Sequence, residues 1–176
     1  MVSIALLKVS GFLGFSFSSR ILYKIFLQAV KGFLIPNHYA FACFVQAYHE
    51  TGAFKSIIGK WNLWGIKKSQ KWTGDIVLVK TTEFINGVKT PTTAWFVDFP
   101  TCQDAIKWWD ALIQRLYKDA YDSRTDYKKF FEHLVDKQPD YAGDPDFQYA
   151  TDPLYVTKLL RVANELKGLY LSSQGG

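Results

Sequence analysis

Two glutamates stand where a carboxyl group could transfer a proton. Glu50 follows a mostly apolar stretch, 38–49, that includes Phe44, and Gly52 comes two residues after it. A carboxylic acid donates a proton at neutral pH only if its pKa is raised, and apolar walls raise it. Glu83 lies in a segment of alternating polarity, where it could serve as a second carboxylate. The residues alone leave open that both are ordinary surface charges.

The stretch before Glu50 has the signals of a helix. Pro36 disfavours helical geometry in the residue before it, and Asn37 can then cap a new helix. Apolar residues dominate 38–49. Gly52 permits the left-handed turn that commonly ends a helix. We therefore expect Glu50 at the end of a helix over about 38–49, at the mouth of whatever this helix faces.

Glu83 is predicted to lie on a β-hairpin. From residue 75 to residue 85 the pattern has period two, which is typical of a strand. Asn86-Gly87 follows, the strongest short signal for a hairpin turn. We expect a returning strand that Pro91 interrupts and that resumes over 94–99.

Three more helices are predicted after the hairpin. Thr101 can cap the first, with Asp104 in its opening turn, and its periodicity runs to residue 116. The second covers about 124–135, with Asp122 or Ser123 as its cap. A loop over 138–148 follows, and Asp152-Pro153 opens a last helix that Gly168 is expected to end. The predicted fold class is therefore α+β, mainly helical.

Four segments together resemble the glucosaminidase domains of glycoside hydrolase family 73. They stand in the family's order and cover roughly residues 36 to 167. The family includes bacterial autolysins, the flagellar peptidoglycan hydrolase and many phage lysins. The segments are Gln46-Ala47-Tyr48-His49-Glu50-Thr51-Gly52, Asn62-Leu63-Trp64-Gly65-Ile66-Lys67, Thr81-Thr82-Glu83-Phe84 and Tyr149-Ala150-Thr151-Asp152-Pro153-Leu154-Tyr155.

The resemblance implies a lysozyme-like fold with a hairpin lobe, and a set of site residues. Glu50 would be the general acid, Glu83 the second carboxylate and Tyr149 a groove tyrosine, while Asp152 is expected to cap the last helix. The substrate-binding residues we expect are Asn62, Trp64, Trp72 and Tyr155. Trp64 and Trp72 are candidates for stacking on sugar rings, although Trp64 could equally belong to the core. Family members commonly have Asn and Phe where this chain has Trp61 and Trp64.

The implied activity is hydrolysis of the β-1,4 bond after N-acetylglucosamine in peptidoglycan, at the bacterial cell wall. An inverting carboxylate pair stands roughly 6.5–9.5 Å apart and a retaining pair about 5–5.5 Å, and the substrate's own acetamido group can also be the nucleophile. The sequence does not choose among these three reaction courses.

The alternative functions are a muramidase or lytic transglycosylase on the same fold, or a wall-binding protein of a virion or secretion assembly. The chemistry requires no metal and no organic cofactor.

Net charge and composition bear on which kind of partner the chain binds. The formal net charge of +5 favours a polyanionic partner, but the basic residues are scattered and no nucleic-acid-binding motif appears. Charge alone therefore ranks no partner first, and no nucleic-acid partner is expected. The resemblance implies glycan strands of peptidoglycan as the partner. Aromatic residues make up 17% of the chain, which suits either an aromatic core or a sugar groove. Cys43 and Cys102 form no disulfide framework, although one bridge between them is possible.

We expect one catalytic domain over 36–170, preceded by an apolar or amphipathic helical segment, 1–35, and followed by a flexible tail, 171–176. The spacing of apolar residues in 21–30 suits an amphipathic helix. This helix could pack on the domain or contact a membrane or a larger assembly. Residues 1–19 make a poor signal peptide, because they lack a basic start and a small-residue cleavage site. Export, or delivery by a phage or secretion apparatus, are both compatible with the segment, and the oligomeric state is not predicted.

Overall fold

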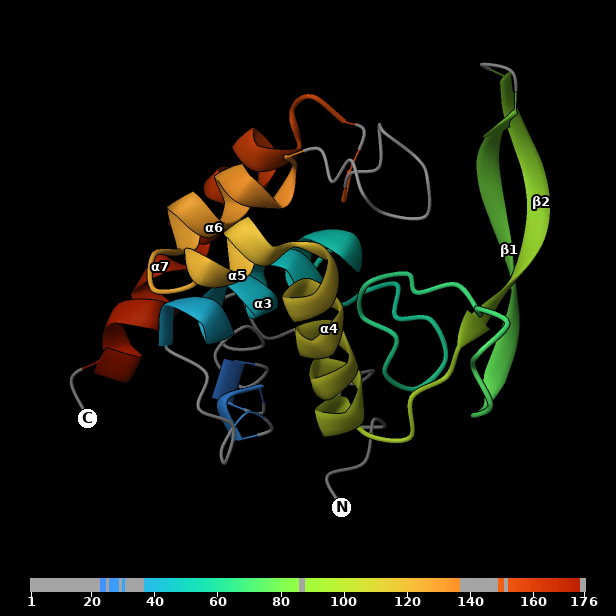
Figure 1. Cartoon of the computed structure of the whole chain (residues 1–176), viewed down its shortest axis with the longest axis horizontal. Helices are drawn as coiled ribbons and strands as arrows, with labels where there is room; N and C mark the ends of the chain where they lie inside the picture. Colours follow the sequence, from blue (N-terminus) through green and yellow to red (C-terminus); the bar gives the residue numbers. More distant parts are fainter. Residues whose placement is uncertain are drawn as a thin grey trace.

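The structure is a computed structural model that describes residues 23–24, 26–28, 30, 37–85, 88–136, 149–150 and 152–174. Within these ranges, the side chains of 82–85, 88–89, 169 and 172–174 lie outside the description. The elements are α3 (Asn37–Glu50), β1 (Ile76–Ile85), β2 (Val88–Val97), α4 (Cys102–Leu116), α5 (Lys118–Asp122), α6 (Tyr127–Leu134) and α7 (Tyr155–Gln174). Helices form the body, and the hairpin of β1 and β2 projects from one side of it (Figure 1).

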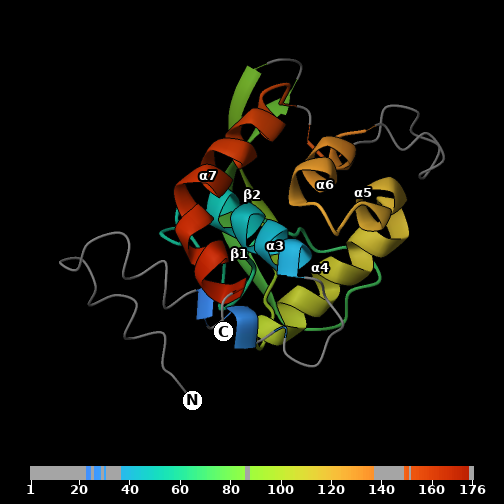
Figure 2. The same cartoon turned by 90° about the vertical axis from the view of Figure 1, so that its left-hand side faces the viewer.

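Helix α3 is the centre of the body. Every residue from Tyr39 to Tyr48 is buried, because this stretch is apolar on all sides and not along one stripe. Figure 2 shows α3 between α7 on one side and α4 to α6 on the other. Aromatic rings fill the contacts: Tyr39 lies 5.1 Å from the ring of Trp109 and 5.4 Å from that of Phe130. The high aromatic content therefore serves mainly to build the core.

A left-handed turn ends α3 directly after Glu50. Gly52, Ala53 and Phe54 all have positive φ, at 56°, 63° and 61°. The buried hydroxyl of Thr51 donates to the carbonyl of Ala47 (2.6 Å) and accepts from the backbone N–H of Phe54 (2.9 Å). The turn predicted at Gly52 is confirmed, and its left-handed conformation continues through Ala53 and Phe54.

Ala53→Gly is expected to raise the free energy of unfolding by about 0.5–1 kcal/mol. A left-handed non-glycine residue costs about 1–2 kcal/mol, and the extra freedom of glycine in the unfolded chain offsets about half of that gain. Urea denaturation measures the change. Ala111→Gly, at an exposed position within α4, is the control and should lose about 1 kcal/mol. A less stable Ala53→Gly protein would show that the turn is not strained at this residue.

The hairpin is more regular than the sequence predicted. β1 and β2 pair antiparallel without a break from Ile76 opposite Val97 to Ile85 opposite Val88. Pro91 pairs with Thr82, so the predicted interruption at Pro91 is wrong. A two-stranded sheet has two edges, and a proline is tolerated in an edge strand because its missing N–H can face away from the partner.

Two of the later helices depart from their predicted bounds. The helix predicted over 124–135 is α6 alone, and its cap is Asp126 in place of Asp122 or Ser123. Asp126 accepts from the backbone N–H groups of Lys128 and Lys129. The short helix α5, which precedes it, was not predicted. Helix α7 does not end at Gly168 but runs on to Gln174, into the segment predicted as a tail. The ring of Tyr170 packs 4.9 Å from that of Phe41, and this contact outweighs the roughly 1 kcal/mol that glycine costs inside a helix.

Part of the N-terminal segment packs into the same core. Tyr23, Phe26 and Val30 are buried, and the ring of Tyr23 lies 5.0 Å from that of Phe44. For these residues the structure supports packing on the domain. The predictions for residues 1–22, for Pro36 and for the loop over 138–148 lie outside the described residues, and the division at residue 36 stays a prediction. No helix in the described part of the chain is long and apolar enough to span a membrane.

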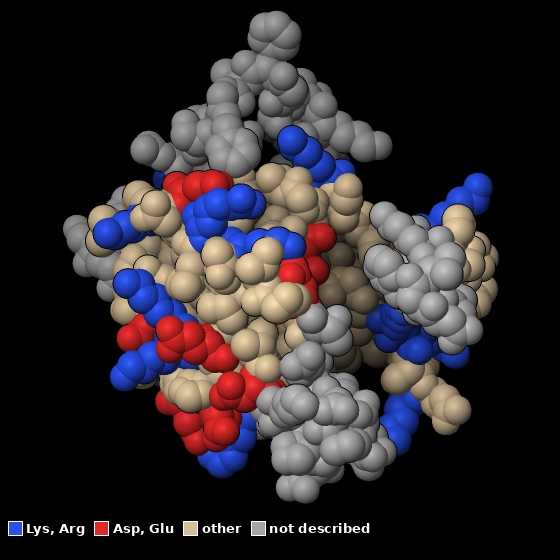
Figure 3. Space-filling model, turned by 90° about the horizontal axis from the view of Figure 1, so that it is seen from above, with Lys and Arg blue, Asp and Glu red and all other residues tan. Residues whose placement is uncertain are grey.

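Charged side chains are mixed on the surface. Lys and Arg are interspersed with Asp and Glu over the face seen in Figure 3, as their scatter along the sequence predicts. Cys43 and Cys102 are buried free thiols, so the bridge that the sequence left open is not formed.

Candidate active site

Glu50 is held by a tyrosine from the other end of the chain. It is the last residue of α3, and it is exposed, whereas the rest of the helix is largely buried. Tyr155, the first residue of α7, donates its hydroxyl proton to Glu50 Oε1 across 2.6 Å. The same hydroxyl accepts from Gln46 Nε2 across 3.2 Å. Gln46 lies one helical turn before Glu50 and is fully buried. A chain of two hydrogen bonds therefore runs from the core to Glu50.

Tyr155 stays a hydrogen-bond donor over the whole physiological pH range. Burial raises the pKa of its hydroxyl well above the ordinary value, and the neighbouring Tyr149 and the charge of Glu50 raise it further. The neutral O–H of Tyr155 thus occupies Glu50 Oε1. Glu50 Oε2 takes no part in this hydrogen bond.

Tyr149 lies beside Tyr155 and Glu50. Its ring lies 6.0 Å from the ring of Tyr155 and 5.4 Å from that of Tyr117. Burial raises the pKa of the Tyr149 hydroxyl well above its usual range, and the charge of Glu50 raises it further. The structure therefore brings together three predicted site residues, Glu50, Tyr149 and Tyr155, from α3 and from the segment that leads into α7.

Two other predicted positions are only partly described or have another role. Glu83 lies on β1 opposite Thr90, but its side chain is outside the described residues, so its role stays a prediction. Asp152 accepts from the backbone N–H of Leu154 and pairs with Lys158. The hydrogen bond from Lys158 is the main cause that lowers the pKa of the Asp152 carboxyl. Asp152 therefore holds the turn directly before α7, the place where the sequence predicts a cap.

Asn62 and Trp64 have structural contacts that explain their places in the motif. Asn62 is 1% exposed, and its amide donates to the carbonyls of Ile66 (2.8 Å) and Val97 (2.9 Å) while its oxygen accepts from the N–H of Ile66 (2.9 Å). It ties the 62–66 turn to the end of β2. Trp64 is 6% exposed and stacks on Trp109 at 5.7 Å. Of the two roles that the sequence left open for Trp64, sugar stacking or core packing, the structure therefore favours core packing.

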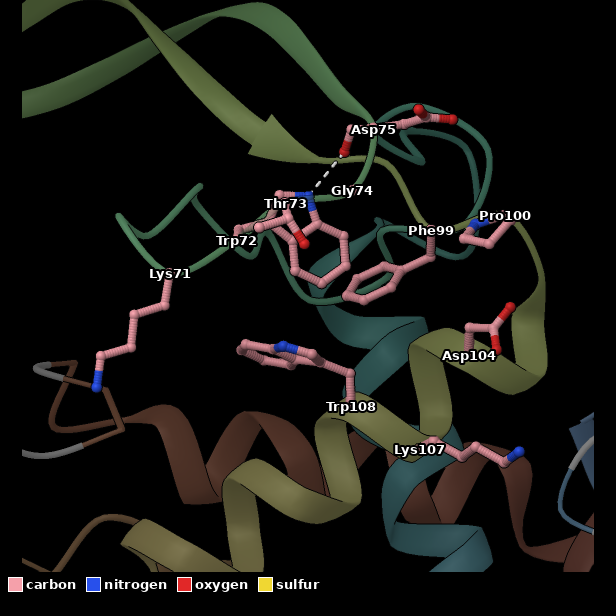
Figure 4. A pocket seen from close by; sticks show the side chains of 10 residues that line it. All are labelled: Lys71, Trp72, Thr73, Gly74, Asp75, Phe99, Pro100, Asp104, Lys107 and Trp108. Carbon is pink, nitrogen blue, oxygen red and sulfur yellow. Dashed lines mark hydrogen bonds between the residues drawn. The ribbon is translucent and has the colours of Figure 1, made fainter.

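Trp72 lies in a pocket with a residue that the sequence did not single out. The pocket, about 680 Å³, lies between the 71–75 segment and α4, and Trp108 forms its other side (Figure 4). Neither Glu50 nor Tyr155 lines it. From the sequence alone, Trp108 is expected to be structural, like its neighbour Trp109. The helical periodicity nonetheless distinguishes the two tryptophans. Trp109 lies on the buried face of α4, and Trp108 lies beside that face.

Among the described residues, no group of three or more His, Cys, Asp or Glu side chains lies close enough together to hold a metal ion. The described site residues are the exposed carboxylate of Glu50, the neutral Tyr155 that donates to it, and Tyr149 beside them. A carboxyl group with such a partner has the chemistry of a general acid or base.

One protein-family model matches most of the chain. The model described as mannosyl-glycoprotein endo-β-N-acetylglucosaminidase, named Glucosaminidase, matches residues 24–168. The chain belongs to the glucosaminidase family. This match confirms the resemblance to glycoside hydrolase family 73, and the chain is a glycoside hydrolase.

Curated relatives of this glucosaminidase are named peptidoglycan hydrolase FlgJ. The protein from Pseudomonas aeruginosa is 30% identical over 130 residues, which are 69% of this chain and 30% of the relative. The protein from Vibrio parahaemolyticus is 28% identical over 131 residues, or 70% of this chain and 39% of the relative. The chain thus spans about a third of the length of these relatives.

Solved structures share the fold. A peptidoglycan hydrolase mutant from Sphingomonas sp. A1 aligns with a TM-score of 0.63 and 27% identity, covering 90% of this chain and 97% of that one. The catalytic domain of the autolysin Auto from Listeria monocytogenes aligns with a TM-score of 0.64 and 21% identity, covering 97% and 98%. The second likeness supports the fold alone. The predicted fold class, α+β and mainly helical, is confirmed.

Proposed function

We propose that the chain hydrolyses the β-1,4 bond between N-acetylglucosamine and N-acetylmuramic acid in peptidoglycan, with Glu50 as the general acid. The observation that carries the proposal is the exposed carboxylate of Glu50, oriented by Tyr155 through a 2.6 Å hydrogen bond. The family supports cleavage next to N-acetylglucosamine. The relatives named as peptidoglycan hydrolases support the wall polymer as the substrate.

In this proposal Glu50 protonates the leaving oxygen from Oε2. Tyr155 holds Oε1, so the carboxyl group presents its other oxygen to a bound substrate in one orientation. Breaking the glycosidic bond develops positive charge on the sugar ring, and the carboxylate left on Glu50 stabilises that charge. We further propose that Tyr149, whose ring lies 6.0 Å from that of Tyr155, binds the acetamido group beside the cleaved bond.

Glu83 supplies the second carboxylate in this proposal. A hairpin residue can approach the sugar from the side opposite to Glu50, where a base would activate water. The configuration of the sugar that is released first reports the course of the reaction. Nuclear magnetic resonance of the fresh product distinguishes inversion from retention.

The proposed place of action is the bacterial cell wall, because the substrate lies there. The protein reaches it by export or by delivery from a phage or secretion apparatus. Its basic net charge, +5, favours association with the anionic wall.

The experiment that tests the bond specificity uses purified peptidoglycan. The soluble fragments released by the wild-type protein are reduced with borohydride and analysed by mass spectrometry. Reduced N-acetylglucosamine ends are expected. Reduced N-acetylmuramic acid ends would make the protein a muramidase, and anhydro ends a lytic transglycosylase. Release of nothing by a folded protein would leave a wall-binding role.

Tyr155→Phe is expected to lower kcat roughly tenfold to hundredfold with little change in KM. The substitution removes the hydrogen bond to Glu50, and a hydrogen bond to a charged group contributes about 1.5–3 kcal/mol. It also leaves the buried Gln46 amide without this partner, so the free energy of unfolding should fall by about 1–2 kcal/mol.

The matched control for Tyr155 is Tyr121→Phe. Tyr121 is half-buried on α5, and its ring, which phenylalanine keeps, packs under Arg124. The control should retain wild-type kcat. A Tyr155→Phe enzyme that loses stability but keeps kcat would show that the tyrosine only fills space.

A further inference from the structure

The pocket between the 71–75 segment and α4 is built on aromatic rings held in place. Phe99 lies at its back and is 1% exposed. Its ring is 5.4 Å from that of Trp72, edge to face, and 6.0 Å from that of Trp108. Trp72 and Trp108 are both half-buried, so each presents part of its ring to the cavity. In Figure 4 the ring of Trp108 lies below the cavity, with Trp72 and Phe99 above it.

The position of Trp72 is fixed by the backbone beside it. Its indole N–H donates to the carbonyl of Asp75 across 3.0 Å. A Cβ at Gly74 would stand 2.7 Å from Cζ2 of the Trp72 ring, so only glycine lets the ring lie against the chain there. A ring ordered before binding loses little conformational entropy when a ligand stacks on it.

The rim of the pocket carries charges of both signs. Lys71 stands at one end, and Lys107 and Asp104 stand at the other, with Asp75 above (Figure 4). Asp75 is also within 3.7 Å of Lys60. A polyanion would meet the carboxylates, and an apolar peptide would bring no polar groups to the charged rim. A neutral sugar fits both features, because its hydroxyl and acetamido groups donate and accept hydrogen bonds while its ring C–H groups lie on the aromatic faces.

We propose that this pocket is an accessory saccharide subsite that binds a hexosamine unit of the glycan strand away from the bond that is cleaved. Trp72 and Trp108 hold the sugar between them, and the charged rim binds its polar groups. The volume of about 680 Å³ is in the range of small-molecule sites and suits one sugar unit with its substituents. The identity of the strand rests on the function proposed above. Its benefit to the enzyme is to hold a long substrate in register with Glu50.

The test measures binding and not turnover. All variants carry Glu50→Gln, and the probe is chitohexaose, the β-1,4-linked hexamer of N-acetylglucosamine, titrated by calorimetry. Adding Trp108→Ala is expected to raise Kd at least tenfold. The matched control is Trp95→Ala, which removes an indole that is 49% exposed on the hairpin and outside the pocket. The control should change Kd by less than twofold.

A second measurement keeps both rings and so does not depend on the stability of a variant. Chitohexaose is titrated into the Glu50→Gln protein while the indole N–H signals are followed by nuclear magnetic resonance. The signals of Trp72 and Trp108 should move, and that of Trp95 should not. Unmoved Trp72 and Trp108 signals, equal losses of affinity in the two alanine variants, or no binding by the Glu50→Gln protein would each overturn the subsite.

The two proposals fail separately. If the wild-type protein releases reducing N-acetylglucosamine ends while Trp108→Ala leaves Kd unchanged, the activity stands and the subsite is wrong. If chitohexaose shifts the Trp72 and Trp108 signals while the wild-type protein releases nothing from peptidoglycan, the pocket binds saccharide and the proposed hydrolysis is wrong.

Discussion

Glu50→Gln is expected to lower kcat on peptidoglycan by about 10²–10⁴-fold, the usual contribution of a general acid. Glutamine has nearly the shape of glutamate, and its side-chain oxygen can still accept the proton of Tyr155. It cannot deliver a proton to the leaving oxygen. KM and the free energy of unfolding should change little, because Glu50 is exposed at the end of α3. Initial rates of fragment release, with urea denaturation of the same samples, measure these quantities.

The control for this substitution is Glu132→Gln. Glu132 is an exposed carboxylate on α6, so the control makes the same chemical change outside the site. It should keep the wild-type rate. If both variants lost activity equally, the effect would come from net charge and not from proton transfer. A Glu50→Gln protein with wild-type kcat would exclude Glu50 as the acid.

Asn62→Ala is expected to lower the free energy of unfolding by about 3 kcal/mol. The change removes three hydrogen bonds within a buried turn, two to Ile66 and one to Val97. Each contributes about 1 kcal/mol, and backbone groups left unpaired in the interior add to the loss. Activity should fall at temperatures where the fold is intact, because the same bonds fix the base of the hairpin to the body. Urea denaturation and a melting curve measure the change.

Asn164→Ala is the matched control, since Asn164 is exposed on α7. Alanine is a better helix former there, so its stability should stay within about 0.5 kcal/mol of wild type or rise slightly. If Asn62→Ala were as stable as this control while binding of glycan fell, Asn62 would contact substrate after all. That result would restore the binding role that its motif suggested.

The sequence predicted the parts of the fold that depend on local signals. Asn37 begins α3, Thr101 caps α4, and β1 ends and β2 begins where the sequence predicts a hairpin. Helix α7 passes Gly168, by contrast, because of the packing of Tyr170 on Phe41, a contact between residues far apart in the chain. The low helix propensity of Gly168 gives no information about that contact.

The site was predictable only in part for a related reason. The family motifs single out Glu50, Tyr149 and Tyr155, and the structure brings the three residues together. The motif around Asn62 has the same specificity in sequence, yet the contacts of Asn62 are with backbone. A motif does not say whether a residue serves the substrate or the turn that supports the site. Burial and hydrogen-bond partners make that distinction.

The most direct test of the central claim follows oxygen from water into the product. Wild-type and Glu50→Gln proteins are incubated with peptidoglycan in water enriched in oxygen-18, and the released ends are analysed by mass spectrometry. We expect one labelled oxygen on each new N-acetylglucosamine reducing end, formed at least about 10²-fold more slowly by Glu50→Gln. Cleavage without label, label on N-acetylmuramic acid ends, or equal rates for the two proteins would contradict it.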